Sequence, residues 1–428
     1  MYTVYSLLLT AGFLLALPWF LWKGRSTGKY LRTFTERMGR LPVYLNVDGD
    51  RAVWIHAVSV GEVLAARPLV PALRERLPSH RIFLSTTTMT GNAVAKKAVR
   101  GIDGLFYAPF DFPHPVRHAL EVVNPSLLVL IETELWPNLI HEAHRRGTRV
   151  AVVNGRLSPR SFRRYRRARR VVGRVLSEVD LFLMQGESHA ERIRALGAPP
   201  GQVQVTGNLK FDAVEPGRVP ERLARLLQAA PGAPSASRPL WIAGSTVTGE
   251  EELVLQAFHR VRQRVPEARL LVAPRHPERF SAVLPLVEAA GFRCLRRSDL
   301  DPLAWQDGEV MLLDTLGELS QLYALASVVF VGGSLVPSGG HNILEPAVAG
   351  KPVIVGPHME NFQEIAEQFR ADRAMLQVGS ADELGDEVAS LMLDDVRRLG
   401  LGERARELVG RNRGAVGRST DALASLLS

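Results

Sequence analysis

The chain has 428 residues, and its 53 Lys and Arg outnumber 44 Asp and Glu, which gives a net charge of +9. At about 150 residues per domain this length predicts two domains, and 46% hydrophobic with 23% charged residues excludes a disordered chain. The single cysteine, Cys294, excludes a disulfide framework, a cysteine-based zinc site and an iron–sulfur cluster.

The first predicted element is an apolar helix at residues 2–22, which contains no charged side chain. About twenty apolar residues are needed to cross a hydrocarbon core of ~30 Å. Basic residues follow this run, starting at Lys23 and Arg25, which is not the order found in a cleaved signal peptide. We therefore expect a single-pass membrane anchor at residues 1–24 with the rest of the chain in the cytoplasm; the alternative is a buried core helix.

The rest of the chain alternates short apolar runs with amphipathic stretches, as parallel sheets with right-handed crossovers do. Helices are expected at 61–76 and 138–146 in the first half. The predicted strands are 52–56, 81–86, 127–131, 149–154 and 181–185 in the first half, and 240–244, 269–273, 310–313, 328–331 and 352–355 in the second. Each half is therefore expected to be an α/β domain of the Rossmann-like, doubly wound type.

Residues 215–239 are rich in Pro, Ala, Gly and Ser and are predicted to link an N-terminal domain at 25–214 to a C-terminal domain at 240–428. The last helices, from about Ala381, are assigned to the C-terminal domain, and the alternative is that they pack on the first domain. Two such domains would face a cleft, and open α/β sheets bind ligands beyond the carboxyl ends of their strands. Functional residues are therefore expected just after the predicted strands.

In the first half, acidic residues follow two of these strands. Glu62 lies in HAVSVGEV at the expected start of a helix. Its two alternative roles there are an acid that caps the helix and a general base, and this segment alone slightly favours the cap. Glu132 and Glu134 lie in IETELWPN, and Glu132, which leaves the strand directly, is expected in the cleft. Lys210 in GNLKFD is the only lysine between residues 98 and 350, so it is a candidate partner for a carboxylate or phosphate.

The run at 154–174 contains nine arginines and no acid. It is either a solvated basic helix or a binding surface for phosphates, through bidentate arginine contacts. Nucleic acid and anionic lipid would both fit, and the expected anchor favours lipid. The predicted acceptor-binding residues are Arg163, Arg164, Arg166 and Arg167.

In the second half, four motifs follow predicted strands: AGSTVTGEEE, APRHPER, DTLGELSQLY and the glycine-rich segment 332–357. We expect backbone amides at Ser338–His341 to be open at a helix N-terminus and to hold an anion. His341 and Glu345 are expected one helical turn apart on one face, where the carboxylate would accept from ribose hydroxyls. Together these motifs predict a nucleotide site.

These segments resemble those of the bacterial 3-deoxy-D-manno-octulosonic acid (Kdo) transferases, in the same order from the anchor to about residue 370. The likeness rests on HAVSVGEV, STTTMTGNAVAKK, YAPFDFP, IETELWPN, NGRLS, GNLKFD, APRHPER, DTLGEL and SGGHNILEP. It implies a two-domain GT-B glycosyltransferase of lipopolysaccharide biosynthesis, anchored to the inner membrane with its catalytic body on the cytoplasmic side. Such an enzyme transfers Kdo from CMP-Kdo to lipid IVA, the lipid A precursor.

The resemblance also implies residue roles. Glu62 matches the general base, and Glu132 and Lys210 match residues that stabilise the transition state. The positions that match CMP-binding residues are Arg275, His276, Leu316, Gly317, Glu318, Asn342, Ile343, Leu344 and Glu345.

A direct displacement with inversion follows from a single carboxylate placed as base. The amides at Ser338–His341 and Arg275 would stabilise the leaving phosphate, so no metal and no resident cofactor are expected. One alternative is a GT-B transferase that uses a UDP-sugar on another membrane lipid. The other is a membrane-tethered nucleic-acid-binding protein, which leaves Glu62 and Glu132 unexplained; nucleic acid is therefore not among the expected partners.

Overall fold

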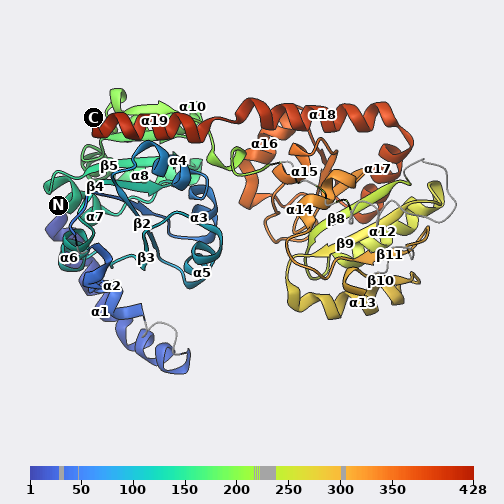
Figure 1. Cartoon of the computed structure of the whole chain (residues 1–428), viewed down its shortest axis with the longest axis horizontal. Helices are drawn as coiled ribbons and strands as arrows, with labels where there is room; N and C mark the ends of the chain where they lie inside the picture. Colours follow the sequence, from blue (N-terminus) through green and yellow to red (C-terminus); the bar gives the residue numbers. More distant parts are fainter. Residues whose placement is uncertain are drawn as a thin grey trace. The chain divides into compact units, whose positions relative to one another are not determined.

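The structure is a computed structural model, and it describes residues 1–27, 33–46, 48–215, 217, 219, 221, 238–299 and 305–428. The side chains of residues 17–27, 43 and 44 lie outside this description. The chain forms two compact units (Figure 1): unit 1 contains residues 1–213 and 412–428, and unit 2 contains residues 214–411. Most of the predicted linker, 215–239, lies outside the described residues.

Unit 1 is built on a seven-stranded sheet of order β3-β2-β1-β4-β5-β6-β7, in which every pair is parallel. The order reverses between β1 and β4, so the chain leaves these neighbouring strands in opposite directions and opens a crevice at their carboxyl ends. The strands are β1 (Ala52–His56), β2 (Arg81–Thr86), β3 (Gly104–Tyr107), β4 (Pro125–Ile131), β5 (Arg149–Gly155), β6 (Leu181–Met184) and β7 (Val203–Val205).

Helices cover both faces of this sheet. Alternate strand residues such as Trp54 and Leu128 pack on one face, and Val53 and Val129 pack on the other, in two separate buried clusters. The helices before the linker are α1 (Tyr2–Thr27), α2 (Phe34–Arg37), α3 (Val60–Ala66), α4 (Leu69–Arg76), α5 (Met89–Ala98), α6 (Pro113–Val123), α7 (Pro137–Arg145), α8 (Pro159–Arg167), α9 (Arg169–Leu176) and α10 (Glu187–Leu196).

Helix α1 packs against unit 1 through its first turns. The Tyr2 hydroxyl donates to Glu178 at 2.7 Å, and the Tyr5 hydroxyl donates to Asp111 at 3.0 Å. Among the residues that the structure describes, none of the helices combines the length and apolar content that crossing a bilayer requires. The anchor at residues 1–24 therefore stays a prediction, and its side chains from residue 17 on lie outside the described ones.

Unit 2 repeats the architecture with a second seven-stranded parallel sheet, of order β10-β11-β9-β8-β12-β13-β14. Its order reverses between β8 and β12. The strands are β8 (Leu240–Thr246), β9 (Arg269–Pro274), β10 (Cys294–Arg296), β11 (Val310–Leu312), β12 (Val328–Val331), β13 (Val353–Val355) and β14 (Leu376–Gln377). The helices are α12 (Glu251–Arg264), α13 (Phe280–Ala289), α14 (Leu319–Leu322), α15 (Leu344–Val348), α16 (Gln363–Ala371), α17 (Ala381–Leu393) and α18 (Asp395–Asn412).

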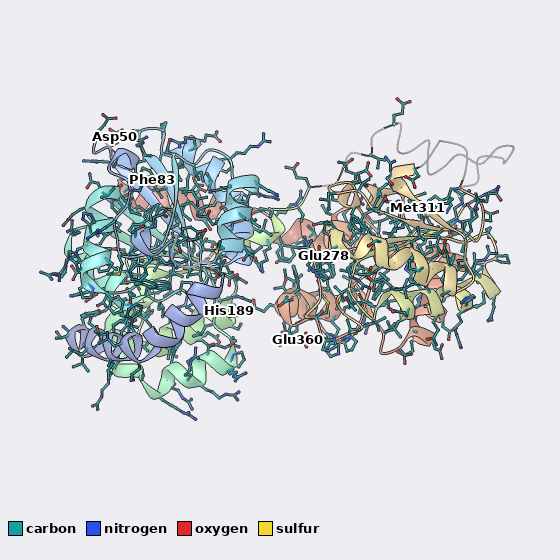
Figure 2. The ribbon with its side chains drawn as sticks, turned by 90° about the horizontal axis from the view of Figure 1, so that it is seen from below. Asp50, Phe83, His189, Glu278, Met311 and Glu360 are labelled. Carbon is teal, nitrogen blue, oxygen red and sulfur yellow. The ribbon has the colours of Figure 1, made fainter. Side chains whose placement is uncertain are left out.

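The two units have separate hydrophobic cores. Phe83 on β2 and Met311 on β11, both labelled in Figure 2, are fully buried in their own unit. The last helix, α19 (Ala415–Leu427), belongs to unit 1, where it contacts α4 and β5 (Figure 1). Of the last helices, it is α19 that packs on the N-terminal domain.

Two expected helices are interrupted in the structure. The predicted helix at 61–76 is divided into α3 and α4 around Pro68, because proline has no amide hydrogen to continue the helical bonding. The basic run is divided into α8 and α9 at Ala168, whose backbone is not helical. Phe162 and Tyr165 pack on the core, whereas Ala168 is exposed.

Candidate active site

In unit 1, the crevice between β1 and β4 places three carboxylates near one another. Glu62 lies in the first turn of α3, directly after β1, and is 6% exposed. Its Oε2 accepts from the Val58 amide at 2.6 Å and its Oε1 from the Ser59 hydroxyl at 2.7 Å. Burial raises the pKa of Glu62 to about 7, with a smaller contribution from Glu134 and Glu132. Glu62 thus binds the backbone at the start of α3, and its pKa lies near neutral pH.

Glu132 leaves β4 in a left-handed backbone conformation, with a φ of 61°. A residue other than glycine adopts this conformation at a cost of about 1–3 kcal/mol, and such strain concentrates at functional sites. Its amide donates to the Val153 carbonyl at 2.8 Å, and its Oε2 accepts from Arg156 Nε at 2.7 Å. The carboxylate is therefore held firmly beside a guanidinium that follows β5.

Lys210 lies on a short 3₁₀ helix, η4 (Leu209–Phe211), which contacts α3. Two asparagines place this turn: Asn208 Oδ1 accepts from the Lys210 amide at 3.0 Å, and Asn154 Oδ1 accepts from the Leu209 amide at 3.0 Å. Asn154 has a φ of 58°, the second strained residue at a strand end of this sheet. The structure thus gathers Glu62, Glu132 and the Lys210 turn on one side of unit 1.

Two further side chains belong to this site: Glu134, which had no role assigned beside the preferred Glu132, and Arg156, which was not predicted. Glu134 accepts from the Trp136 indole nitrogen at 3.0 Å and lies near enough to Glu62 to raise its pKa. Arg156 holds Glu132. Glu134 lies in the motif IETELWPN and Arg156 in the motif NGRLS. The position of Arg156 directly after β5 is the signal that could have identified it. The predicted arginines of α8, Arg163, Arg164, Arg166 and Arg167, are all exposed.

In unit 2, several donor-site candidates lie close together around the crevice between β8 and β12. The Arg275 amide donates to the Thr246 carbonyl at 2.9 Å, and the Arg275 and His276 side chains are exposed. Burial lowers the pKa of His341, and the charges of Arg275 and His276 contribute to the same direction. Tyr323 is buried near Glu345 and Arg275.

The remaining residues predicted to bind CMP differ in their exposure to solvent. Leu316 is 74% exposed beside Gly317, whose φ of 86° suits only glycine, and Glu318 accepts from Arg297 at 3.0 Å. Ile343 and Leu344 are buried, so they would contact a bound nucleotide only through their backbone.

One expectation about the glycine-rich segment is wrong, and a second is wrong at Ser338 and Gly340. Helix α15 begins at Leu344, so His341 lies in the preceding loop and not one turn below Glu345; its Nδ1 is 2.8 Å from the Gly332 carbonyl, and Glu345 accepts from Asn342 at 3.0 Å. The amides of Ser338 and Gly340 are also not open, because they donate to the Val336 and Gly333 carbonyls.

The amides that do gather around a single group are those that follow β12, and the group is the carboxyl of the chain's own Glu250. Its carboxylate accepts from the amides of Gly333, Ser334 and Leu335 at 2.6, 3.0 and 2.9 Å. Glu250 is fully buried. It therefore fixes the start of the loop that leads to Asn342 and Glu345.

Comparison with known proteins decides the family. Residues 32–213 match a family described as 3-deoxy-D-manno-octulosonic-acid transferase (kdotransferase). The 3-deoxy-D-manno-octulosonic acid transferase of Haemophilus influenzae is 37% identical over 398 residues, which cover 92% of this chain and 91% of that protein. The chain belongs to the Kdo transferase family. A second Kdo transferase, from Bordetella pertussis, is 35% identical over 98% of both chains.

Solved structures share the fold of this chain, which consists of two Rossmann-like domains of the GT-B type. The UDP-N-acetylglucosamine 2-epimerase of Neisseria meningitidis matches 88% of this chain and 99% of its own, with a TM-score of 0.56 and 12% identity. At that identity the likeness shows the fold alone.

Proposed function

We propose that this protein transfers Kdo from CMP-Kdo to lipid IVA with inversion at the anomeric carbon, and that Glu62 is the general base. The observation that carries the proposal is a buried carboxylate with a pKa of about 7 at the crevice of unit 1, in a member of the Kdo transferase family. A base with this pKa is ionised often enough at neutral pH to accept a proton and basic enough to take it from a hydroxyl.

The reaction breaks the bond between the Kdo anomeric carbon and the CMP phosphate while the acceptor oxygen attacks that carbon. The acceptor hydroxyl gives its proton to Glu62, and CMP leaves with the bonding electron pair. Arg275 and His276 would stabilise the charge that develops on the leaving phosphate. Glu132, held by Arg156, would stabilise the positively charged sugar. Lys210 would pair with a carboxylate or phosphate of the donor.

The same proposal assigns the exposed arginines of α8 to the phosphates of the lipid IVA disaccharide. Arginine binds phosphate in a bidentate manner, and the four predicted side chains form no ion pair with an acid among the described residues. We further propose that α1 keeps the protein at the inner membrane with its catalytic units in the cytoplasm. Such a location brings the enzyme to an acceptor that its acyl chains hold at the bilayer.

The test is mass spectrometry of lipid IVA after incubation with the purified full chain and a system that generates CMP-Kdo. We expect a mass gain of one or more Kdo units, with no gain from the Glu62→Gln protein. No gain from the folded native protein, while a reference Kdo transferase is active in parallel, would overturn the proposal. Transfer from UDP-sugars instead would retain the glycosyltransferase chemistry but replace the donor.

A further inference from the structure

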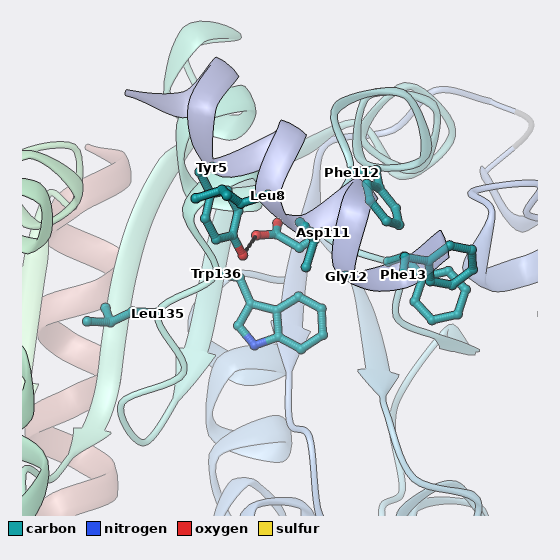
Figure 3. A pocket seen from close by; sticks show the side chains of 10 residues that line it. Tyr5, Leu8, Gly12, Phe13, Asp111, Phe112, Leu135 and Trp136 are labelled. Atoms are coloured by element: carbon teal, nitrogen blue, oxygen red, sulfur yellow. Dashed lines mark hydrogen bonds between the residues drawn. The ribbon is translucent and has the colours of Figure 1, made fainter. Parts of the chain in front are cut away.

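A pocket of about 480 Å³ lies between α1 and the loops that precede α6 and α7 in unit 1 (Figure 3). This volume is within the range of sites that bind small molecules. Most of its lining is hydrocarbon or aromatic ring, and the lining residues are Tyr5, Leu8, Leu9, Gly12, Phe13, Phe110, Asp111, Phe112, Leu135 and Trp136.

The polar atoms of this lining are already used within the protein. Asp111 Oδ1 accepts from the Leu139 amide at 2.8 Å, and its Oδ2 accepts from the Tyr5 hydroxyl at 3.0 Å and the Asn138 amide at 3.2 Å. The Trp136 indole nitrogen donates to Glu134. The pocket therefore favours an apolar occupant, because a polar one would lose its water without gaining equivalent hydrogen bonds.

The pocket is directly connected to the catalytic segment. Leu135 and Trp136 continue the segment that begins with Glu132, and the Trp136 ring meets the edge of His56, at the end of β1, with 4.9 Å between ring centroids. Glu134, which binds Trp136, is one of the carboxylates that raise the pKa of Glu62. A molecule in the pocket therefore contacts Trp136, whose indole binds the Glu134 carboxylate that acts on the pKa of Glu62.

The outer face of α1 continues this apolar surface. Its leucines Leu7, Leu8, Leu14 and Leu15 are 58–84% exposed, and Leu8 also lines the pocket. A helix that exposes such a row of large apolar side chains marks a surface that contacts a membrane or an apolar ligand. An acyl chain could thus pass from a lipid layer along α1 into the pocket without crossing water.

We propose that this pocket binds one acyl chain of the glycolipid acceptor and so positions its sugar at Glu62. The inference rests on the proposed function for the identity of the acceptor. It adds a hydrocarbon-binding subsite to the phosphate contacts assigned to α8, and it makes α1 part of the acceptor site in addition to its role at the membrane.

The test fills the pocket from α1. A Cβ at Gly12 has no neighbour within 4 Å, so Gly12→Leu adds a side chain to the pocket without a clash. Leucine also favours a helix more than glycine does, so the fold is retained. Ala11→Leu is the matched control, because this substitution adds similar bulk to the same turn. Ala11 is exposed and does not line the pocket.

Two acceptors separate the contribution of the chain from that of the sugar: lipid IVA and its fully deacylated, phosphorylated disaccharide. We expect Gly12→Leu to lower kcat/KM for lipid IVA about tenfold, since each methylene kept out of an apolar site costs about fourfold in affinity. Turnover of the deacylated disaccharide should stay unchanged, and Ala11→Leu should resemble the native protein with both. Equal effects of the two variants on lipid IVA would overturn the inference.

A binding measurement keeps the inference testable even if the protein transfers no Kdo. The fluorescence of Trp136 is obtained as the difference between the native protein and a Trp136→Phe variant. Lipid IVA with brominated acyl chains should quench this Trp136 fluorescence, and Gly12→Leu should abolish the quenching. No quenching of Trp136 would overturn the pocket assignment. Equal quenching by brominated phospholipid would show that any bilayer lipid occupies the pocket, which would overturn the assignment to the acceptor.

Discussion

The local surroundings of Glu62 determine the direction of its carboxylate and the pKa on which its proposed role as base depends. Its oxygens accept from Val58 and Ser59 at the start of α3, an arrangement that fixes the direction of the carboxylate. Burial opposes ionisation more strongly than these hydrogen bonds favour it, so the pKa is raised to about 7. A carboxylate in water, with a pKa of about 4.3, would be a far weaker base.

For Glu62→Gln we expect kcat to fall by about 10²–10⁴, because glutamine keeps the shape of the side chain and cannot accept the proton. Donor binding, measured by calorimetry with CMP, should be retained.

The pH profile gives an independent check of the same residue. The base acts when deprotonated, so kcat/KM of the native enzyme should rise with pH through about 7 and level off above it. His56 does not account for this limb, since burial lowers its pKa to about 4. Near-normal turnover of Glu62→Gln, or a limb far from 7 in the native enzyme, would remove Glu62 from the role of base.

Glu250 yields a second prediction, for unit 2. In Glu250→Gln an amide NH₂ group would replace one of the oxygens that accept from Gly333, Ser334 and Leu335. A buried donor left facing other donors costs about 1–3 kcal/mol, so unit 2 should be destabilised and the KM for CMP-Kdo raised. The neighbouring Glu252 is exposed, and Glu252→Gln should change neither urea unfolding nor donor KM. An unaffected Glu250→Gln protein would show that the loop holds its shape without this carboxylate.

At the scale of elements, α8 presents its arginines to solvent while Phe162 and Tyr165 attach it to the core. Replacing Arg163, Arg164, Arg166 and Arg167 by alanine should therefore leave the fold intact. We expect the KM for lipid IVA to rise about 10–100-fold, as expected for the loss of one or two hydrogen bonds to charged phosphate, with the KM for CMP-Kdo unchanged.

The lysine version of the same four positions is the control. It retains the charge but not the bidentate geometry, so its KM for lipid IVA should fall between the native and alanine proteins. If CMP affinity falls in the alanine protein instead, α8 acts on the donor or on folding.

Sequence patterns predicted the buried strands and failed for the half-exposed strands at the sheet edges. Each predicted strand is present within a few residues, because a buried parallel strand is a continuous apolar run. Strands β3, β7, β10 and β14 were missed because most of their residues are half-exposed or exposed, so their sequences carry little apolar pattern. The equally short β11 and β13 are fully buried and were predicted.

The candidate site shows the same division. A motif directly after a strand predicted the neighbourhood of Glu62 and Glu132, because strand order brings carboxyl ends together. The clamp by Glu250 joins segments more than eighty residues apart, and the pocket forms between α1 and loops about a hundred residues later in the chain. Neither local pattern nor spacing contains that information.

At the scale of the whole molecule, α19 ties the end of the chain to unit 1. The Asp212 carboxylate accepts from the amides of Gly414 and Val416, at 2.7 Å each, and Ala415 and Leu423 are buried in the core of unit 1. A carboxylate at a helix N-terminus is favoured by the helix dipole as well as by these bonds.

Asp212→Ala should loosen this contact. Loss of such a cap costs about 1–2 kcal/mol, so amide hydrogen exchange in α19 should accelerate about tenfold. Asp212→Asn keeps one acceptor oxygen and should show a smaller change. Unchanged exchange in Asp212→Ala would mean that apolar packing alone holds α19.

The return of the chain to unit 1 also sets the order in which the protein can be completed during synthesis. Unit 1 begins at the first residue but includes residues 412–428, so about two hundred residues of unit 2 are made before its last helix exists. At 5–20 residues per second this interval lasts roughly 10–40 s. During this time the surface later covered by α19 is exposed on the ribosome. Only a chain translated to its end can bury it, so a prematurely terminated product would present an apolar face that chaperones and proteases recognise.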